Sequence, residues 1–376
     1  MAAAVAAFTI GRVFGLMELF VLGAGLVVAI IVAMVVVRQP MPQVVVQRVV
    51  RPSMVAVGEP ARVDIQVVNV DRRKTPHVQL WEPVGQNGGA PMQLAALLPN
   101  ESASAAYRVP TSRRGLLTVG PLTAHRRDVL GLCSKATTIA GSDDVLIVPQ
   151  HVHLPFPAAG SAGRLGQHLR MKAWGQTGGE FHSQREYQPG DDLRRVNWKA
   201  SARSEELVVR ETALEGVRRC TVVLDCHHGQ YDHDAFERAV CATASVTLSS
   251  TAAGVPCRLV SNDVDLRGPE VGNAGLRWLA MVRPNDQPLD YTTFGRGVAD
   301  GLGLVVLVTG SSTSPAAGSV RAGLSPDETM VVVSIRDADG LGRLSVDGTS
   351  LDALAESWSA LVVGSSASGF GGRGIA

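Results

Sequence analysis

Hydrophobic residues follow three successive patterns along this chain of 376 residues. An unbroken apolar run covers residues 19–37, a period-two alternation occupies residues 42–140, and short apolar runs alternate with helical patterns over residues 219–363. Alternation is typical of half-buried strands, whereas apolar runs separated by helices are typical of parallel sheets. The sequence therefore predicts an α+β multidomain chain with a membrane anchor, a β-sandwich and an α/β domain, in that order.

The run from Leu19 to Val37 consists of apolar residues and glycine. A helix of this length would span about 28 Å, close to the thickness of a hydrocarbon core. The run predicts one transmembrane helix within an anchor of residues 1–40. It is too long for a signal peptide, and no Ala-x-Ala cleavage site follows Val37.

Arginines near the anchor predict which side of the membrane holds the rest of the chain. Arg38, Arg48 and Arg51 follow the apolar run, whereas Arg12 precedes it. The positive-inside rule then places the large C-terminal part in the cytoplasm. The five cysteines form no C-x-x-C pair, which fits reduced thiols in that compartment.

Residues 42–140 show the alternation of an antiparallel sandwich. Residues 62–67 are the clearest example, and further short strands are expected at Val78–Trp81, Tyr107–Val109 and Leu116–Val119, with proline and glycine between them. The pattern predicts a small β-sandwich of immunoglobulin-like type.

Residues 141–218 are interpreted as a connecting segment that contains a distinctive charged stretch. A buried strand is expected at residues 145–148, and residues 149–179 are rich in proline and glycine without clear periodicity. The following domain, residues 219–363, is expected to hold strands at 221–224, 257–260, 304–308 and 330–335, and helices at 235–250, 276–282 and 351–362. Asp234 and Glu237 are spaced as a capping box for the first helix. The Gly- and Ser-rich tail, residues 364–376, is expected to be disordered.

Composition excludes several function classes. A net charge of +1 gives no bulk attraction to nucleic acid. None of the four lysines follows a glycine, so the Walker A sequence is absent and the chain is not a P-loop ATPase. The sequence also lacks the G-x-S-x-G, H-E-x-x-H and Rossmann glycine motifs of hydrolases, metalloproteases and dinucleotide-binding proteins.

The charged stretch at residues 185–203, REYQPGDDLRRVNWKASAR, is the strongest candidate for function. If residues 192–202 are helical, acids and arginines three apart can pair, and the stretch could be a neutralised anchor pinned by two aromatic rings. Alternatively it is a docking surface for an acidic partner, because arginine and tryptophan are enriched at binding hot spots. A nucleic-acid site is the third alternative, weakened by the interleaved acids. The candidate residues are Arg185, Glu186, Tyr187, Gly190, Asp191, Asp192, Arg194, Arg195, Trp198, Lys199 and Arg203.

This stretch, with its flanks from Gly178 to Glu211, resembles the signature of a bacterial family, the domain of unknown function 58. Asn197 stands where relatives often have Asp or His. Arg113-Arg114-Gly115 matches a turn of the family, and Asp128-Val-Leu-Gly-Leu132 matches its Asp-Pro-Phe-Gly-Leu turn except that Val129 replaces the proline.

The resemblance implies a fold and a role. It implies a hairpin of two membrane helices, so we interpret residues 1–10 as the remnant of a first helix and expect the true start upstream. It further implies a von Willebrand factor A-like α/β domain. Such proteins resemble membrane-tethered partners of MoxR-type AAA+ ATPases, which favours a non-enzymatic adaptor.

Asp225 is the candidate metal ligand of the α/β domain, because the resembled fold carries an Asp-x-Ser-x-Ser site for Mg²⁺ there. His227 and Gly229 occupy the two serine positions, so structural hydrogen bonding by Asp225 is favoured over Mg²⁺ binding. Nearby donors could also suit a transition metal, although a polar loop explains them equally. The alternative to an adaptor is therefore a metal-dependent hydrolase that uses Asp225 and the following histidines. The nearby donors are Cys226, His227, His228, Asp232, His233 and Asp234.

Overall fold

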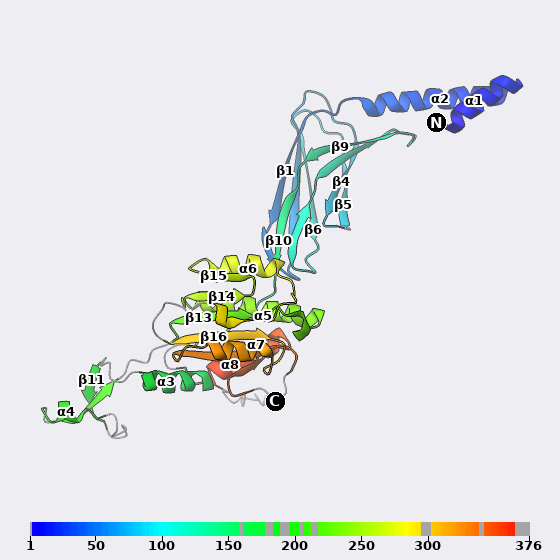
Figure 1. Cartoon of the computed structure of the whole chain (residues 1–376). Coiled ribbons are helices and arrows are strands. Elements are labelled where there is room, and N and C mark those ends of the chain that lie inside the picture. Colours follow the sequence, from blue (N-terminus) through cyan, green and yellow to red (C-terminus); the bar gives the residue numbers. More distant parts are fainter. Residues whose placement is uncertain are drawn as a thin grey trace, which may run out of the picture. The chain divides into compact units, whose positions relative to one another are not determined.

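The computed structural model divides the chain into two compact units, Met1–Val148 and Pro149–Ala376 (Figure 1). The residues it describes are 2–86, 88–157, 161–176, 183–188, 196–203, 206–211, 217–294, 302–337 and 342–364. The tail expected to be disordered lies outside these residues, apart from Gly364.

Two apolar helices open the first unit, α1 (Ala2–Phe14) and α2 (Met17–Arg38). They pack as an antiparallel hairpin in which Gly11 lies against the backbone of Phe20 and Gly23 against that of Phe8. A side chain at either glycine would prevent this approach. By its length of 22 residues and its composition, α2 can cross a membrane, and it contains the expected span.

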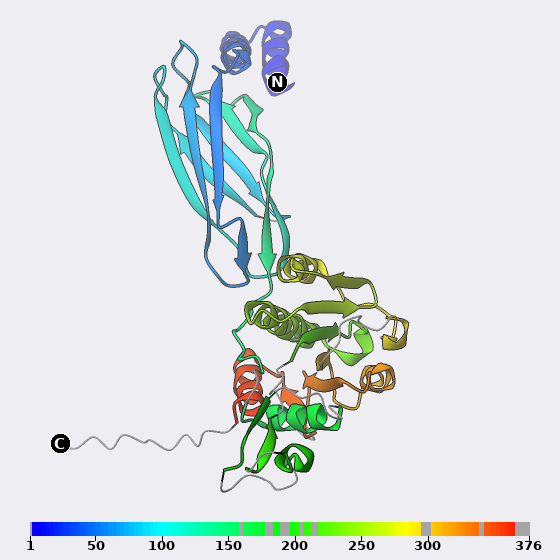
Figure 2. The same ribbon diagram turned by 90° about the vertical axis from the view of Figure 1, so that its left-hand side faces the viewer.

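The rest of the first unit is built from β-strands in two sheets (Figure 2). The three-stranded sheet has the order β1-β3-β6, and the seven-stranded sheet has the order β2-β10-β7-β4-β8-β9 with β5 paired to β4. In β3, Val63, Ile65 and Val67 are buried while the residues between them point outward, as the alternation predicted. The strands are β1 (Val44–Arg51), β2 (Met54–Ala56), β3 (Ala61–Asn69), β4 (Val78–Val84), β5 (Gly88–Leu94), β6 (Ser102–Val109), β7 (Gly115–Val119), β8 (Leu122–Arg127), β9 (Ser134–Ala140) and β10 (Asp143–Val148).

Strand β10 was expected within the connecting segment, but it lies between β2 and β7 of this sheet. Its buried residues Val145 and Ile147 belong to the core of the first unit. The first unit therefore extends to Val148.

Arg48 is not the free juxtamembrane charge that the sequence suggested. Its side chain is 4% exposed and forms an ion pair with Glu82, which is fully buried. It also donates to Asp143 Oδ2 and to the Gly141 carbonyl oxygen, each at 2.8 Å. Arg48 thus links β1 of one sheet to β4 and β10 of the other, and of the three arginines that follow the apolar run, Arg38 and Arg51 are exposed.

The second unit is centred on a six-stranded sheet with the order β15-β14-β13-β16-β17-β18. All neighbouring pairs are parallel except β14 with β15. The strands β13 and β16 read as near-continuous apolar runs because both of their faces are covered. The strands are β13 (Arg219–Leu224), β14 (Cys257–Ser261), β15 (Val264–Arg267), β16 (Gly303–Thr309), β17 (Glu328–Ser334) and β18 (Ser345–Asp347).

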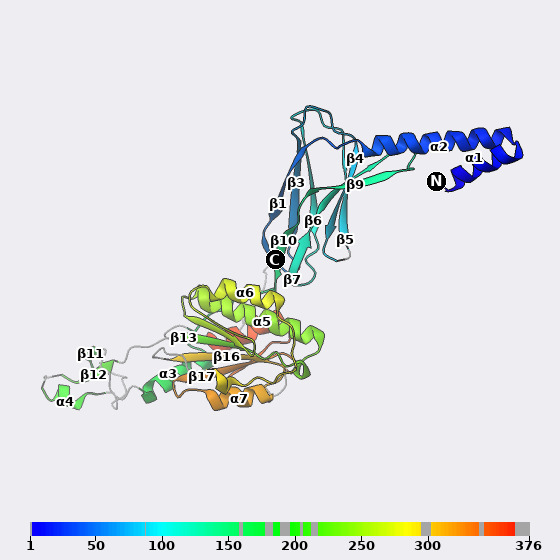
Figure 3. The same ribbon diagram turned by 45° about the horizontal axis from the view of Figure 1, so that its top comes forward.

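Helices cover both faces of this sheet (Figure 3). Helix α7 packs with the 3-10 turn η3 (Tyr291–Thr293) over Val223, Val305 and Leu307. Helix α5 packs with α6 and α8 on the opposite face. The helices are α3 (Arg164–Gln176), α5 (His233–Ala252), α6 (Val271–Met281), α7 (Pro315–Gly323) and α8 (Leu351–Val362).

Two local expectations in the second unit are wrong. Asp232, and not Asp234, caps α5, because its side chain accepts a 2.6 Å hydrogen bond from the amide of Ala235. Helix α3 occupies part of the stretch expected to be irregular. Among its described side chains, Leu165 and Leu169 are buried one turn apart, which gives only a weak periodicity in the sequence.

Candidate functional site

Asp225 lies at the topological switch point of the parallel sheet, where successive strands are added on opposite sides of β13. The chain passes from β13 through α5 to β14 on one side, and β16 then pairs on the other side of β13. Open parallel sheets place ligand sites at the carboxyl ends of the strands at such a point. Asp225 follows β13 directly, and Thr309 ends β16.

Both carboxylate oxygens of Asp225 accept hydrogen bonds from other groups of the protein. Its Oδ2 accepts from Thr309 Oγ1 at 2.9 Å, and its Oδ1 accepts from the amide of His227 at 3.1 Å. Asp225 is 1% exposed, and this burial raises the pKa of its carboxyl against the lowering effect of the two hydrogen bonds. Thr309 also hydrogen-bonds Ser314, the N-cap of α7.

This donor set does not fit Mg²⁺. The ion takes six ligands in octahedral geometry. Here one buried carboxylate already has hydrogen-bond donors on both oxygens, and the two positions that would supply hydroxyls are His227 and Gly229. Asp225 instead ties the end of β13 to the end of β16, which is the structural role that the sequence favoured.

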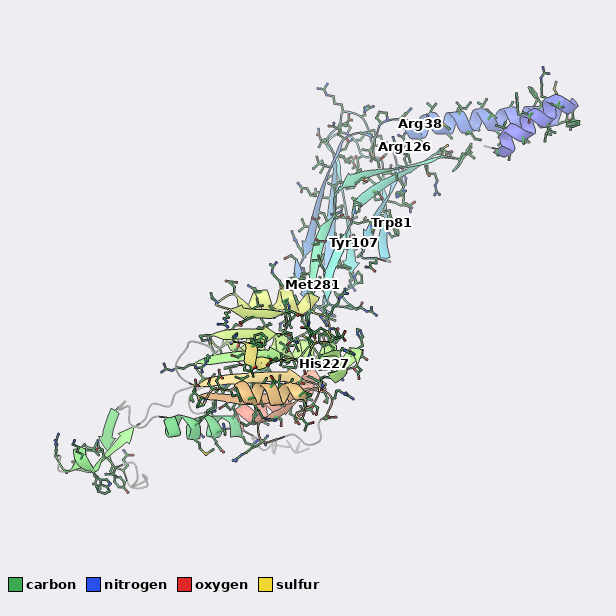
Figure 4. All side chains as sticks on the ribbon, in the orientation of Figure 1. Arg38, Trp81, Tyr107, Arg126, His227 and Met281 are labelled. Atoms are coloured by element: carbon green, nitrogen blue, oxygen red, sulfur yellow. The ribbon has the colours of Figure 1, made fainter. Side chains whose placement is uncertain are left out.

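The histidines and cysteine after β13 point to separate partners. Cys226 Sγ accepts a hydrogen bond from Ser261 Oγ at 3.2 Å, and His228 Nδ1 lies 2.8 Å from Asp286 Oδ1. The side chain of Asp232 is used as the α5 cap. Within the part of the chain that the structure describes, no three His, Cys, Asp or Glu side chains are grouped as a metal site would require. His227 is labelled in Figure 4.

The described residues of the charged stretch and its flanks form a small hairpin, called here the signature hairpin. It consists of β11 (Ser183–Glu186), α4 (Trp198–Ser201) and β12 (Val208–Glu211), with β11 and β12 antiparallel. Of the stretch 192–202 that was considered as a helix, α4 forms Trp198–Ser201, and residues 192–195 lie outside the described residues. The preceding residue, Asn197, caps α4 by accepting from the amide of Ala200 at 3.3 Å.

Asn197 has a structural role in the signature hairpin. It is 4% exposed, and its backbone N–H donates to the Val208 carbonyl oxygen at 2.8 Å. Asparagine and aspartate cap helices about equally well. A side chain of this kind at position 197 therefore needs no charge to hold α4 against β12.

The described candidates of the signature hairpin are largely exposed. Trp198 is 63% exposed, and Lys199, Arg203 and Glu186 are also exposed, while Tyr187 is half-buried. This exposure weighs against the interpretation in which Trp198 pins a buried knot and favours the docking interpretation. Arg185 lies on β11 but its side chain is outside the described residues, as are Gly190, Asp191, Asp192, Arg194 and Arg195.

Exposure of Trp198 leads to a prediction about stability. Trp198→Ala is expected to change the free energy of unfolding by less than about 0.5 kcal/mol, the range for surface substitutions. Denaturant melts of the full-length protein in detergent check this. A loss of about 3 kcal/mol or more would show that the ring is buried in solution.

A second basic surface lies on the outer face of the three-stranded sheet. Arg51, Arg62 and Arg108 are direct cross-strand neighbours and all are exposed. Arg51 and Arg62 line a shallow hollow of about 470 Å³, where Arg62 Nε pairs with Asp64 at 2.6 Å. Like charges directly opposite one another destabilise a sheet, and the pairing of Arg62 with Asp64 offsets part of this repulsion.

Thr309, the hydrogen-bond partner of Asp225, is the residue of this site that sequence reasoning missed. Its signal is the same as that of Asp225, since each is the first polar residue after an apolar strand. Parallel strands end at the same edge of a sheet, so the two side chains could have been paired in advance once β13 and β16 were taken as neighbours.

Part of the chain is similar to known proteins. Residues 183–282 match the family model described as "Protein of unknown function DUF58", a range that holds the signature hairpin and Asp225. The Uncharacterized protein YeaD of Bacillus subtilis (strain 168) is 25% identical over 189 residues, which are 48% of this chain and 44% of that protein. The match therefore spans less than half the length of this relative.

Solved structures resemble the chain only weakly. The CARDB domain of the PF1109 protein from Pyrococcus furiosus covers 29% of this chain and 90% of its own length, with 16% identity and a TM-score of 0.22. The alkylpurine DNA glycosylase AlkC of Pseudomonas fluorescens covers 28% of this chain and 30% of its own, with 11% identity and a TM-score of 0.20. TM-scores of this size do not define a shared fold.

The chain is thus an α+β protein with an N-terminal helix long and apolar enough to cross a membrane. Its residues 183–282 match the DUF58 family, as the signature residues indicated.

Proposed function

We propose that this protein is a membrane-tethered, non-enzymatic adaptor that acts with a MoxR-type AAA+ ATPase. In this proposal α2 is the anchor, the first unit is an immunoglobulin-like sandwich, and the second is a von Willebrand factor A-like interaction domain. The observation that carries the proposal is the exposed Trp198 beside Lys199 and Arg203, within the residues that match the family model. Exposed tryptophan and arginine are the residue types most enriched at binding hot spots.

The state of Asp225 weighs against the alternative, a metal-dependent hydrolase. Its oxygens take hydrogen bonds from Thr309 and from the backbone of His227, so neither is presented to a metal or to a water molecule. A catalytic metal also needs an open coordination position. An adaptor without its own P-loop would depend on the ATPase for energy.

A cytoplasmic location for both units is part of the proposal. Exposed Arg38 ends α2 and exposed Arg51 follows it, whereas Arg12 precedes α2, which favours the cytoplasmic side for the chain after α2. The described cysteines form no disulfide bond, which fits a reducing compartment. An ATPase partner would find its nucleotide there.

Binding of the full-length protein, held in lipid nanodiscs, to a purified MoxR-type ATPase tests the proposal. Trp198→Ala and Arg203→Ala are each expected to weaken binding by about 1 to 3 kcal/mol while the protein stays folded. Arg321→Ala removes another exposed arginine, on α7, and serves as the matched control, with unchanged affinity expected.

Two outcomes would contradict this arrangement. Unchanged affinity in a stable Trp198→Ala variant would remove the signature hairpin from the interface. A loss on Arg62→Ala instead would place the partner on the arginine row of the first unit.

A further inference from the structure

Three large apolar side chains project from the turn between β8 and β9, called here the β8–β9 tip (residues 128–133). Val129 is fully exposed, Leu130 is 68% exposed and Leu132 is 44% exposed. Single exposed apolar residues are normal on a protein surface, but a contiguous group marks a binding surface. These residues form the Asp-Val-Leu-Gly-Leu motif of the sequence, which the adaptor function does not use.

The conformation of the tip is fixed by the side chain of Asp128. Its Oδ2 accepts from the amide of Leu130 at 2.9 Å, and its Oδ1 accepts from the amide of Cys133 at 2.5 Å. Gly131 adopts a φ of 70° and donates from its amide to the Asp128 carbonyl oxygen at 3.0 Å. Because the turn is tied internally, the apolar side chains are presented outward by a defined loop structure.

The position of the tip follows from three points along β8. Leu122, at the start of the strand, is buried in the sandwich core. Arg126 Nη1 donates to the carbonyl oxygen of Gln39 at 3.3 Å, and Gln39 is the residue that follows α2. The apolar residues come at least three positions later, which at about 3.3 Å per residue is roughly 10 Å farther along the hairpin.

The hairpin also lies against α2, since β9 contacts this helix. The labelled Arg38 and Arg126 mark the place where the two meet (Figure 4). The tip therefore extends past Gln39, at the C-terminal end of α2, in the direction away from the sandwich core.

A collar of positive charge surrounds the base of the tip. Arg126 lies directly opposite Lys135 across the β8–β9 pair, and Arg127 is the next residue along. Asp128 is the sole acidic residue from 122 to 142, and its carboxylate is occupied by backbone amides. Two opposed cations destabilise a strand pair unless an anion lies near them.

We propose that the β8–β9 tip inserts into the headgroup region of the anionic membrane leaflet from which α2 emerges. Apolar residues above a basic collar are the composition of segments that lie in this interface, about 5 to 10 Å deep. The insertion adds a second contact beside α2, so the sandwich is held against the bilayer at a fixed angle. The inference rests on the proposed spanning of the membrane by α2.

Fluorescence of a tryptophan placed at the tip tests this insertion in the full-length protein. Leu130→Trp is reconstituted into vesicles of phosphatidylglycerol and phosphatidylcholine, with and without lipids brominated in the upper acyl chain. The added emission is expected to be blue-shifted and mostly quenched by the brominated lipids, and little affected by iodide. Vesicles of phosphatidylcholine alone should give weaker quenching, because the collar then has no anionic lipid to bind.

Leu116→Trp is the matched control. Leu116 is 53% exposed. It lies opposite Leu146, which in turn lies opposite Met54. Met54 comes just after β1, at the end of this strand that is farther from Gln39. Its emission should be quenched by iodide and not by brominated lipids.

The outcomes separate the inference from the anchor on which it rests. Protein that floats with the vesicles while Leu130→Trp emission stays open to iodide overturns tip insertion and leaves the anchor intact. Equal quenching in both vesicle types overturns the role of the basic collar, and failure to float overturns anchor and insertion together.

Discussion

Glu82→Ala is expected to destabilise the first unit by about 3 to 5 kcal/mol, the cost of leaving a buried charge without its partner. Glu82 is fully buried, pairs with Arg48 and accepts from Tyr107 Oη at 2.6 Å. Removing it leaves the guanidinium of Arg48 between the two sheets with one carboxylate, that of the half-exposed Asp143.

Hydrogen exchange of peptides from β1 and β4, followed in increasing denaturant, measures this loss in the full-length protein. The matched control is Asp143→Ala, which removes the other carboxylate bound by Arg48. That side chain is 54% exposed, so a loss below about 1 kcal/mol is expected. Equal losses for the two variants would contradict the assignment of Glu82 as the principal partner.

A double substitution distinguishes a missing partner from a damaged core. Arg48→Met combined with Glu82→Leu removes both charges and keeps the apolar volume, so it should recover much of the stability lost in Glu82→Ala. Failure to recover would mean that the ion pair itself, together with Tyr107, holds the two sheets in register.

Local sequence patterns predicted many of the helices and strands. Helix α8 has the expected bounds, and strand β13 was displaced only at its start, because long periodic or apolar runs define such elements. Helix α7 was missed although Ser314 and Pro315 form a helix start signal. Its small residues bury little area each, so apolar periodicity alone did not reveal it.

Long-range pairings were the part that sequence could not supply. Arg48 was taken as a juxtamembrane charge, since its partner Glu82 lies on another strand of the opposite sheet. Trp198 was left open between a buried anchor and a docking residue for the same reason, because exposure depends on what packs over a side chain. Asp225 was interpreted as structural from two lost hydroxyl positions, but its partner Thr309 required the strand order.

The largest stability loss in the second unit is expected from Trp358→Ala, about 3 to 5 kcal/mol. Trp358 lies on α8, is fully buried, and donates from Nε1 to the Pro155 carbonyl oxygen at 2.7 Å. The substitution leaves a cavity under α8 and an acceptor without its donor, and each adds to the cost. Denaturant melts measured beside those of Trp198→Ala compare the same change at a buried and an exposed site. Trp358→Phe keeps most of the ring volume and should lose less than Trp358→Ala, whereas equal small losses at positions 358 and 198 would show that α8 does not anchor the chain through this ring.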